Sequence, residues 1–177
     1  MKRLFFALDI SEHDKAVIAK WRAHHLTSSY QQSKTIPQDN FHITLAFLGL
    51  VDSSQQNRLI TNMTQLRQQA ELSGSLPLTL NQIGLFKKPQ VLYIANTEIP
   101  KALVTLHAQV NNLAHKEQLP IEERAYLPHI SLFRKAKNLA IDLSNPNIQI
   151  SAPSFSLYQS MSHSNGVQYT PIASWPI

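Results

Sequence analysis

The 177-residue chain contains no cysteine and only four glycines. The absence of cysteine excludes disulfide bonds, thiolate-bound zinc and a thiolate nucleophile. The glycines follow neither the spacing of a P-loop nor that of a Rossmann fingerprint, so no phosphate-binding glycine loop is expected. We therefore expect no cofactor.

Long hydrophobic runs and a high charge density are also missing. No segment approaches the roughly 18 apolar residues of a membrane span, and the apolar run from Leu4 to Leu8 ends at Asp9, too soon for a signal peptide. We expect a cytoplasmic protein without a membrane partner. Only 15% of residues are charged, but 16 Lys and Arg face 11 Asp and Glu. The net charge of +5 slightly favours a polyanionic partner such as RNA.

The same succession of predicted elements occurs twice along the chain. A strand at residues 3–9 is followed by a helix capped by Ser11 and ending near His25, a polar loop, and a strand from His42 that stops at Gly49. A strand at 91–96 is followed by a helix from about Pro100 to Gln118, a loop and a strand from His129. The two strand-to-histidine intervals are 39 and 38 positions.

The elements between and after these units complete the prediction. A second helix is expected from a cap at Ser53 or Ser54 to about Glu71, and the segment 75–86 is expected to pair with 91–96 through the turn 87–90. Short strands are predicted at 148–150, 155–161 and 167–172, the last two as a hairpin. The sequence predicts an α+β fold with antiparallel sheets. We expect one bilobal domain over residues 1–177, with pseudo-repeats of about 1–88 and 89–177 and a cleft between the lobes.

The two equivalent strands carry the same polar pair. In "HITL" the alternation of a strand places His42 and Thr44 on one face, and Ile43, Leu45 and Phe47 on the other. In "HISL" His129 and Ser131 share a face in the same way. A third match, at His25, lies where a helix ends and lacks the apolar fourth residue, so we interpret it as surface.

This pair of motifs resembles the two H-x-[ST]-x motifs of the 2H phosphoesterase superfamily. Together with "RLFFALDI" near the start, "DNFHITLAFLG" and "LPHISLFR" are most similar to the bacterial and archaeal RNA 2′,3′-cyclic phosphodiesterases, also called LigT-type or 2′-5′ RNA ligases. The resemblance covers essentially the whole chain. Ser131 stands where threonine is the more usual residue, and its hydroxyl is kept. The family fold is bilobal with pseudo-twofold symmetry.

Two histidines suit phosphodiester chemistry without a metal, because an imidazole with a pKa of about 6.5 can give or take a proton near neutral pH. The resemblance implies that His42 is the general acid and His129 the general base in opening an RNA 2′,3′-cyclic phosphate to a 2′-phosphomonoester. The reverse reaction would join RNA ends through a 2′-5′ bond. The residues themselves do not decide which histidine has which role. Thr44 and Ser131 are candidates to hold the phosphate oxygens, and Arg134 is a candidate phosphate clamp or a solvated strand-end residue.

Several alternatives stay open at this stage. A metal site would use the same histidines but lacks neighbouring ligands, and a non-catalytic RNA-binding module would leave the paired motif unexplained. Another 2H activity, on 2′-5′ oligonucleotides, RNA 3′ ends or ADP-ribose cyclic phosphates, is the nearest competitor. Phe86 and Tyr126 are either ordinary core or edge aromatics or residues that stack on an RNA base. Lys87 and Lys88 either form a solvated turn or contact the RNA backbone. The other histidines, including His107 and His163, are interpreted as surface residues. We expect a monomer without an obligate protein partner.

Overall fold

Two four-stranded antiparallel sheets form the frame of the molecule. In the computed structural model, which describes all residues except 71–73, 123, 141–143 and 165, the strand orders are β10-β9-β1-β3 and β2-β7-β6-β5, and β4 and β8 form a separate pair. The predicted α+β fold is confirmed. The elements are β1 Lys2–Leu8, α1 Glu12–His25, β2 Lys34–Thr35, the 3-10 helix η1 Gln38–Asn40, β3 Ile43–Val51, α2 Ser53–Gln68, β4 Leu76–Leu80, β5 Gln82–Phe86, β6 Val91–Ala95, α3 Lys101–Lys116, β7 His129–Arg134, β8 Ile148–Ala152, β9 Ser154–His163 and β10 Gly166–Pro176.

The repeated order of elements along the chain is matched by the way the strands pair. β1 pairs with β3 and β6 pairs with β7, so each histidine motif lies beside the first strand of its own unit. Each sheet nevertheless takes strands from both halves of the chain, because β9 and β10 join β1, while β2 and β5 join β7 and β6. From this exchange of strands we propose that the two pseudo-repeats, residues 1–88 and 89–177, form one domain rather than two.

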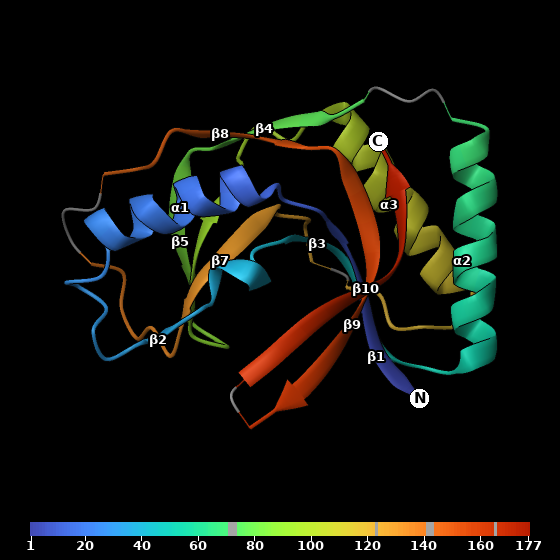
Figure 1. The fold of residues 1–177 in the computed structure, drawn as a ribbon, viewed down its shortest axis with the longest axis horizontal. Helices are drawn as coiled ribbons and strands as arrows, with labels where there is room; N and C mark the ends of the chain where they lie inside the picture. The colour runs from blue at the N-terminus through green and yellow to red at the C-terminus, as the bar shows by residue number, and fades with distance from the viewer. Residues whose placement is uncertain (71–73, 123, 141–143, 165) are drawn as a thin grey trace.

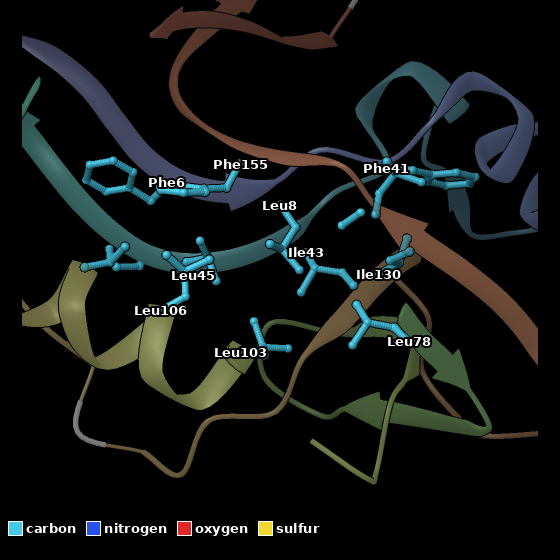
Figure 2. Packing of buried hydrophobic residues seen from close by; sticks show 14 of the residues in the cluster. Phe6, Leu8, Phe41, Ile43, Leu45, Leu78, Leu103, Leu106, Ile130 and Phe155 are labelled. Carbon is cyan, nitrogen blue, oxygen red and sulfur yellow. The ribbon is translucent and has the colours of Figure 1, made fainter. Parts of the chain in front are cut away.

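The helices also contact elements from both halves of the chain. α3 packs on β3 and on α2, whereas α1 packs on β8 and η1 and reaches β7 through Arg22. Leu103 and Leu106 of α3 lie beneath β1 and β3 in Figure 2, and Leu45 faces them from the sheet. One continuous apolar cluster therefore includes residues of both sheets and all three helices.

Arg22 is a buried cation that joins the two halves of the chain. Its Nη1 donates hydrogen bonds to the carbonyl oxygens of Ile36 at 2.5 Å and Leu132 at 3.2 Å. Its guanidinium lies 5.0 Å from the ring centroid of Phe41 and 5.6 Å from that of Phe133. These contacts fasten α1 and the segment before His42 to the strand that carries His129.

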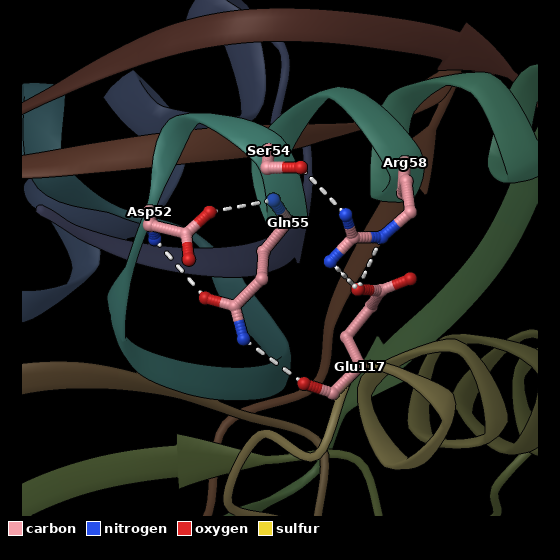
Figure 3. Close-up of polar contacts among 5 residues, drawn as sticks. All are labelled: Asp52, Ser54, Gln55, Arg58 and Glu117. Carbon is pink, nitrogen blue, oxygen red and sulfur yellow. Dashed lines mark hydrogen bonds and ion pairs between the residues drawn. The ribbon is translucent and has the colours of Figure 1, made fainter.

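Local sequence signals account for most element boundaries. The Ser11 hydroxyl accepts from the backbone N–H of Asp14, as predicted. The prediction that Ser53 or Ser54 caps α2 is wrong: the cap is Asp52, whose carboxylate accepts from the Gln55 N–H while the Gln55 side chain accepts from the Asp52 N–H (Figure 3). The predicted end of this helix at Glu71 lies outside the described residues.

The cap of α2 also connects this helix to α3. The Gln55 amide donates to the Glu117 carbonyl, and the Arg58 guanidinium pairs with the Glu117 carboxylate at 2.7 Å (Figure 3). Both contacts lie at the C-terminal end of α3, where basic or donor groups favour the helix dipole. The start of α2 and the end of α3 are thereby joined.

Strand β3 departs from simple alternation, and this corrects one prediction. The register with β1 shifts twice, so that Leu45 and Leu48 are extra residues, and Gly49 lies within the strand at a φ of 69°. Leu45 and Ala46 are consequently both buried, and Phe47 is turned out with 57% of its surface exposed. Phe47 therefore lies on the face of His42 and Thr44, not on the apolar face. The extra residue Leu45, which has no partner in β1, reverses the alternation between Thr44 and Phe47 and places the Phe47 ring there.

Other differences are smaller. The segment 75–86 is two strands, β4 and β5, in different sheets, and the predicted polar loop before His42 contains β2 and η1. The predicted C-terminal hairpin is confirmed as β9 and β10, which extend away from the body of the molecule (Figure 1). Among the described residues, no helix combines the length and apolar character needed to cross a membrane.

Replacing Arg22 with Met should lower the free energy of unfolding by about 2–4 kcal/mol, because two buried carbonyls lose a charged donor. Urea denaturation of the purified variant measures this loss. Lys20→Met, on an exposed position of the same helix, is the matched control and should have little effect. Equal losses in the two variants would contradict the role given to Arg22.

Candidate active site

The two histidine motifs meet in one cavity. His42 lies directly before β3 and His129 is the first residue of β7, and these two strands contact each other. A cavity of about 670 Å³ is lined by all five residues that the sequence singles out, namely His42, Thr44, His129, Ser131 and Arg134. The geometry thus brings together every predicted site residue, although it does not by itself assign their roles.

Each histidine is oriented by the same hydrogen bond. The His42 Nδ1 lies 2.7 Å from the Asn40 carbonyl oxygen, and the His129 Nδ1 lies 2.8 Å from the Leu127 carbonyl oxygen. A carbonyl only accepts, so Nδ1 carries the hydrogen and donates it. Nε2 is left as the acid or base atom of each ring. In both motifs the acceptor is two residues before the histidine, which repeats the geometry in the two halves of the chain.

Aromatic rings flank both imidazoles. Phe5 and Tyr169 have ring centroids 5.0 Å from that of His42. Phe86 and Tyr93 are 4.9 and 5.3 Å from His129. The Tyr93 ring lies over Gly84, where a Cβ atom would come within 2.3 Å of it, so the glycine makes space for this ring. Each histidine is therefore held by a hydrogen bond on one nitrogen and by packing on its faces and edges.

These surroundings disfavour the charged imidazolium. The pKa of His42 is lowered to about 4, first by burial and then by the positive charges of His129 and Arg134, while the Asn40 hydrogen bond opposes the shift. Burial also lowers the pKa of His129, where the Leu127 hydrogen bond and the Glu122 carboxylate act in the opposite direction. In the absence of an anion, both histidines are expected to be neutral near pH 7.

The hydroxyl and cationic groups lie around the same centre. Thr44 and Ser131 are half-buried on the histidine-bearing faces of β3 and β7, and Arg134 is exposed at the end of β7. Lys34 of β2 is the cross-strand neighbour of Arg134 and also lines the cavity. The region around His42 and His129 therefore presents donors and positive charge toward a bound anion.

Some functional candidates were missed or misplaced by sequence reasoning. His107 is not a surface residue: it is half-buried and stacks on Tyr126 at 3.9 Å. The Tyr126 hydroxyl donates to the Thr44 carbonyl, and Phe86 stacks on Tyr93, so these two aromatics pack as part of the site wall. His163 is exposed and lines the cavity from β9. Contacts between residues far apart in the chain have no signature within a short motif. The positions of His107 and His163 could therefore not be predicted from the motifs.

His42, His129 and the exposed His163 are the histidines in the lining of the cavity. Among the residues that the structure describes, no three His, Asp or Glu side chains gather in an arrangement suited to a metal ion. Lys87 and Lys88 lie exposed in the turn between β5 and β6 and do not line the cavity.

The lowered pKa of His42 can be measured directly. Titration of the imidazole protons by nuclear magnetic resonance should place the His42 midpoint near pH 4. Arg134→Gln should raise this pKa, because it removes a charge that opposes protonation. Lys137→Gln, which removes an exposed cation outside the cavity, is the matched control and should shift it less. An unperturbed His42 in the native protein would contradict the site electrostatics described above.

The chain is similar to known proteins over almost its full length. The chain is 29% identical to the RNA 2′,3′-cyclic phosphodiesterase of Escherichia coli (strain K12), covering 99% of this chain and 97% of the relative. It is 26% identical to the Methanocaldococcus jannaschii protein of the same name, covering 98% and 99%. The crystal structure of E. coli LigT complexed with 3′-AMP, at 28% identity, matches with a TM-score of 0.85 and covers 99% of this chain and 98% of that one.

A family model gives the classification. The model of the 2′-5′ RNA ligase superfamily matches residues 10–155, a span that includes both histidine motifs and all four strands of the β2-β7-β6-β5 sheet. The predicted resemblance is confirmed, and the chain belongs to the 2′-5′ RNA ligase superfamily.

Proposed function

We propose that this protein is an RNA 2′,3′-cyclic phosphodiesterase that opens the cyclic phosphate at an RNA end to a 2′-phosphomonoester. The observation that carries the proposal is the matched pair of imidazoles, each fixed through Nδ1 and each with a hydroxyl two residues later, on the wall of one cavity. The relatives named RNA 2′,3′-cyclic phosphodiesterase, matched over nearly the full length, support the choice of substrate.

The chemistry requires one proton to be taken and one to be given. In the proposed roles, the Nε2 of neutral His129 takes a proton from the attacking water, and the Nε2 of protonated His42 gives a proton to the departing O3′ of ribose. The bond from phosphorus to the water oxygen forms as the bond from phosphorus to O3′ breaks. Each positioned proton transfer contributes about 10²–10⁴-fold to the rate. No metal enters this scheme.

His42 must be protonated to act as the acid, although its pKa in the free protein is about 4. A phosphodiester anion beside an imidazole favours the imidazolium, so substrate binding raises the pKa of the histidine. The proton is thus taken up together with the substrate. This coupling lets a half-buried histidine serve as an acid near neutral pH without remaining charged in the empty site.

The other site residues have supporting roles in the proposal. The hydroxyls of Thr44 and Ser131 donate to the two non-bridging oxygens of the phosphate, which carry negative charge through the transition state. Arg134 binds the phosphate with its guanidinium group from the rim. The partner is RNA or a nucleotide with a 2′,3′-cyclic phosphate, and we expect the protein to act in the cytoplasm as a monomer.

Replacement of either histidine tests the proposal. His42→Ala and His129→Ala should each lower kcat for cytidine 2′,3′-cyclic phosphate by about 10²-fold or more, because each removes one proton transfer. His115→Ala, at an exposed position at the end of α3, should leave kcat unchanged. The wild-type product should be the 2′-phosphate, formed in the presence of EDTA and identified by chromatography. Turnover that survives both active-site replacements would contradict the mechanism.

The hydroxyls are tested by isosteric change. Thr44→Val keeps the shape of the side chain but removes its donor, and it should lower kcat by about 10²-fold with a smaller effect on KM. Thr44→Ser should restore most of the rate. The same comparison at the second motif uses Ser131→Ala with Ser131→Thr. Equal rates for the valine and serine variants would show that the Thr44 hydroxyl has no part in the reaction.

A further inference from the structure

The two site histidines are bonded alike but are packed against different kinds of structure. His129 is flanked by Phe86 and Tyr93, which lie on β5 and β6 of the same four-stranded sheet. His42 has the ring of Tyr169, from β10, at 5.0 Å between centroids. One side of the His42 imidazole therefore depends on where β10 lies.

Tyr169 belongs to a part of the β9–β10 hairpin that extends beyond the rest of its sheet. β9 pairs with β1 from Phe155 to Gln159. Among the described residues, 160–163 of β9 pair with β10 alone, and their partners are 166–169. We call residues 160–163 and 166–169 the outer hairpin (Figure 1). Two strands by themselves are only marginally stable, so the outer hairpin needs contacts with the body of the protein to keep Tyr169 in place.

Asn40 makes such a contact. Its side-chain Nδ2 donates a hydrogen bond of 2.8 Å to the carbonyl oxygen of Val167, in the outer hairpin. Its own carbonyl oxygen accepts the hydrogen bond from the Nδ1 of His42. Val167 is two residues before Tyr169, whose ring packs on His42. One residue thus holds the imidazole with its backbone and the outer hairpin with its side chain.

The second motif shows that the bond to the imidazole does not need an asparagine. Leu127 stands two residues before His129, as Asn40 does before His42, and its carbonyl oxygen accepts from the His129 Nδ1. Every residue offers such a carbonyl. The amide of Asn40 is therefore not required by the imidazole bond, and its own hydrogen bond runs to the outer hairpin.

We propose that Asn40 is a positioning residue, which fastens the outer hairpin so that Tyr169 keeps the His42 imidazole packed and aimed. This inference rests on the proposed function, in which His42 gives the proton to O3′. Asn40 takes no chemical step itself. A displacement of about 1 Å in a catalytic group can cost about 10²-fold in rate, so the loss of this one bond should be visible in kcat.

The same contact affects the protonation of His42. Burial is the largest cause of its lowered pKa, and the ring of Tyr169 covers part of the imidazole. Release of the outer hairpin should expose the imidazole to water and raise its pKa. Three positive groups also lower this pKa and stay in the chain when Asn40 is replaced: Lys15 of α1, and His129 and Arg134 of β7. The titratable groups of the outer hairpin that line the cavity are His163 and Tyr169.

The test replaces Asn40 with leucine, the residue of the second motif, and uses Gln38→Leu as the matched control. Gln38 is an exposed amide in the same 3-10 helix and does not line the cavity. Titration by nuclear magnetic resonance should show the pKa of His42 raised by about one unit or more in Asn40→Leu, toward its ordinary value of about 6.5. The pKa of His129 should change much less, and Gln38→Leu should change neither.

The rate gives a second readout of the same variants. For cytidine 2′,3′-cyclic phosphate, Asn40→Leu should lower kcat about tenfold or more with a smaller change in KM, because the proton donor and not the substrate is misplaced. Gln38→Leu should keep the kcat and KM of the wild type. A kcat in Asn40→Leu equal to that of the wild type would overturn the positioning role.

The outcomes separate this inference from the proposed function. An unchanged His42 pKa in Asn40→Leu, or equal shifts of His42 and His129, would overturn the role given to Asn40. If the wild type opens no cyclic phosphate, the proposed function fails, and the titration still decides whether Asn40 holds the His42 imidazole in place. Should Asn40→Leu fail to fold, as judged by circular dichroism, Asn40→Ala removes the same amide with less bulk and must shift the pKa of His42 alone.

Discussion

The hydrogen bond from each histidine Nδ1 to the carbonyl two residues before it is the constraint on which the site depends. It selects the tautomer, aims Nε2, and ties the orientation of each ring to the backbone of its own strand. Because the bond is local, it is repeated in each motif wherever the strand is placed. The rest of the fold must bring β3 and β7 together at the correct separation. The exchange of strands between the two halves of the chain does this.

The exchange of strands between the two halves of the chain explains why the two sheets are held in a fixed relation to each other. Strands from both halves enter each sheet, α3 packs on β3, and Arg22 of α1 bonds to the backbone of β7. A movement of one sheet against the other would therefore break apolar packing and buried hydrogen bonds. In the proposed function, the two histidines gain from this the preorganisation that catalysis by positioned groups needs. The aromatic rings around each imidazole extend the same constraint to the side chains.

The sequence was informative where the determinants are local. His42 with Thr44, and His129 with Ser131, could be found because alternation in a strand and the nearly equal intervals before each motif are visible in the chain itself. The face of the strand on which Phe47 lies could not be predicted from the sequence, because it depends on a bulge that arises only when β3 pairs with β1. The stacking of His107 on Tyr126 likewise joins a helix to a distant segment. Such contacts are set by packing between elements, which one sequence does not specify.

The central claim is that both histidines carry protons and that neither forms a bond to phosphorus, so displacement occurs in one in-line step. The stereochemistry at phosphorus tests this most directly. Hydrolysis of a single diastereomer of a nucleoside 2′,3′-cyclic phosphorothioate in ¹⁸O-labelled water gives a 2′-phosphate whose configuration can be determined. The account predicts inversion at phosphorus. Retention would require two displacements through a covalent intermediate and would contradict it.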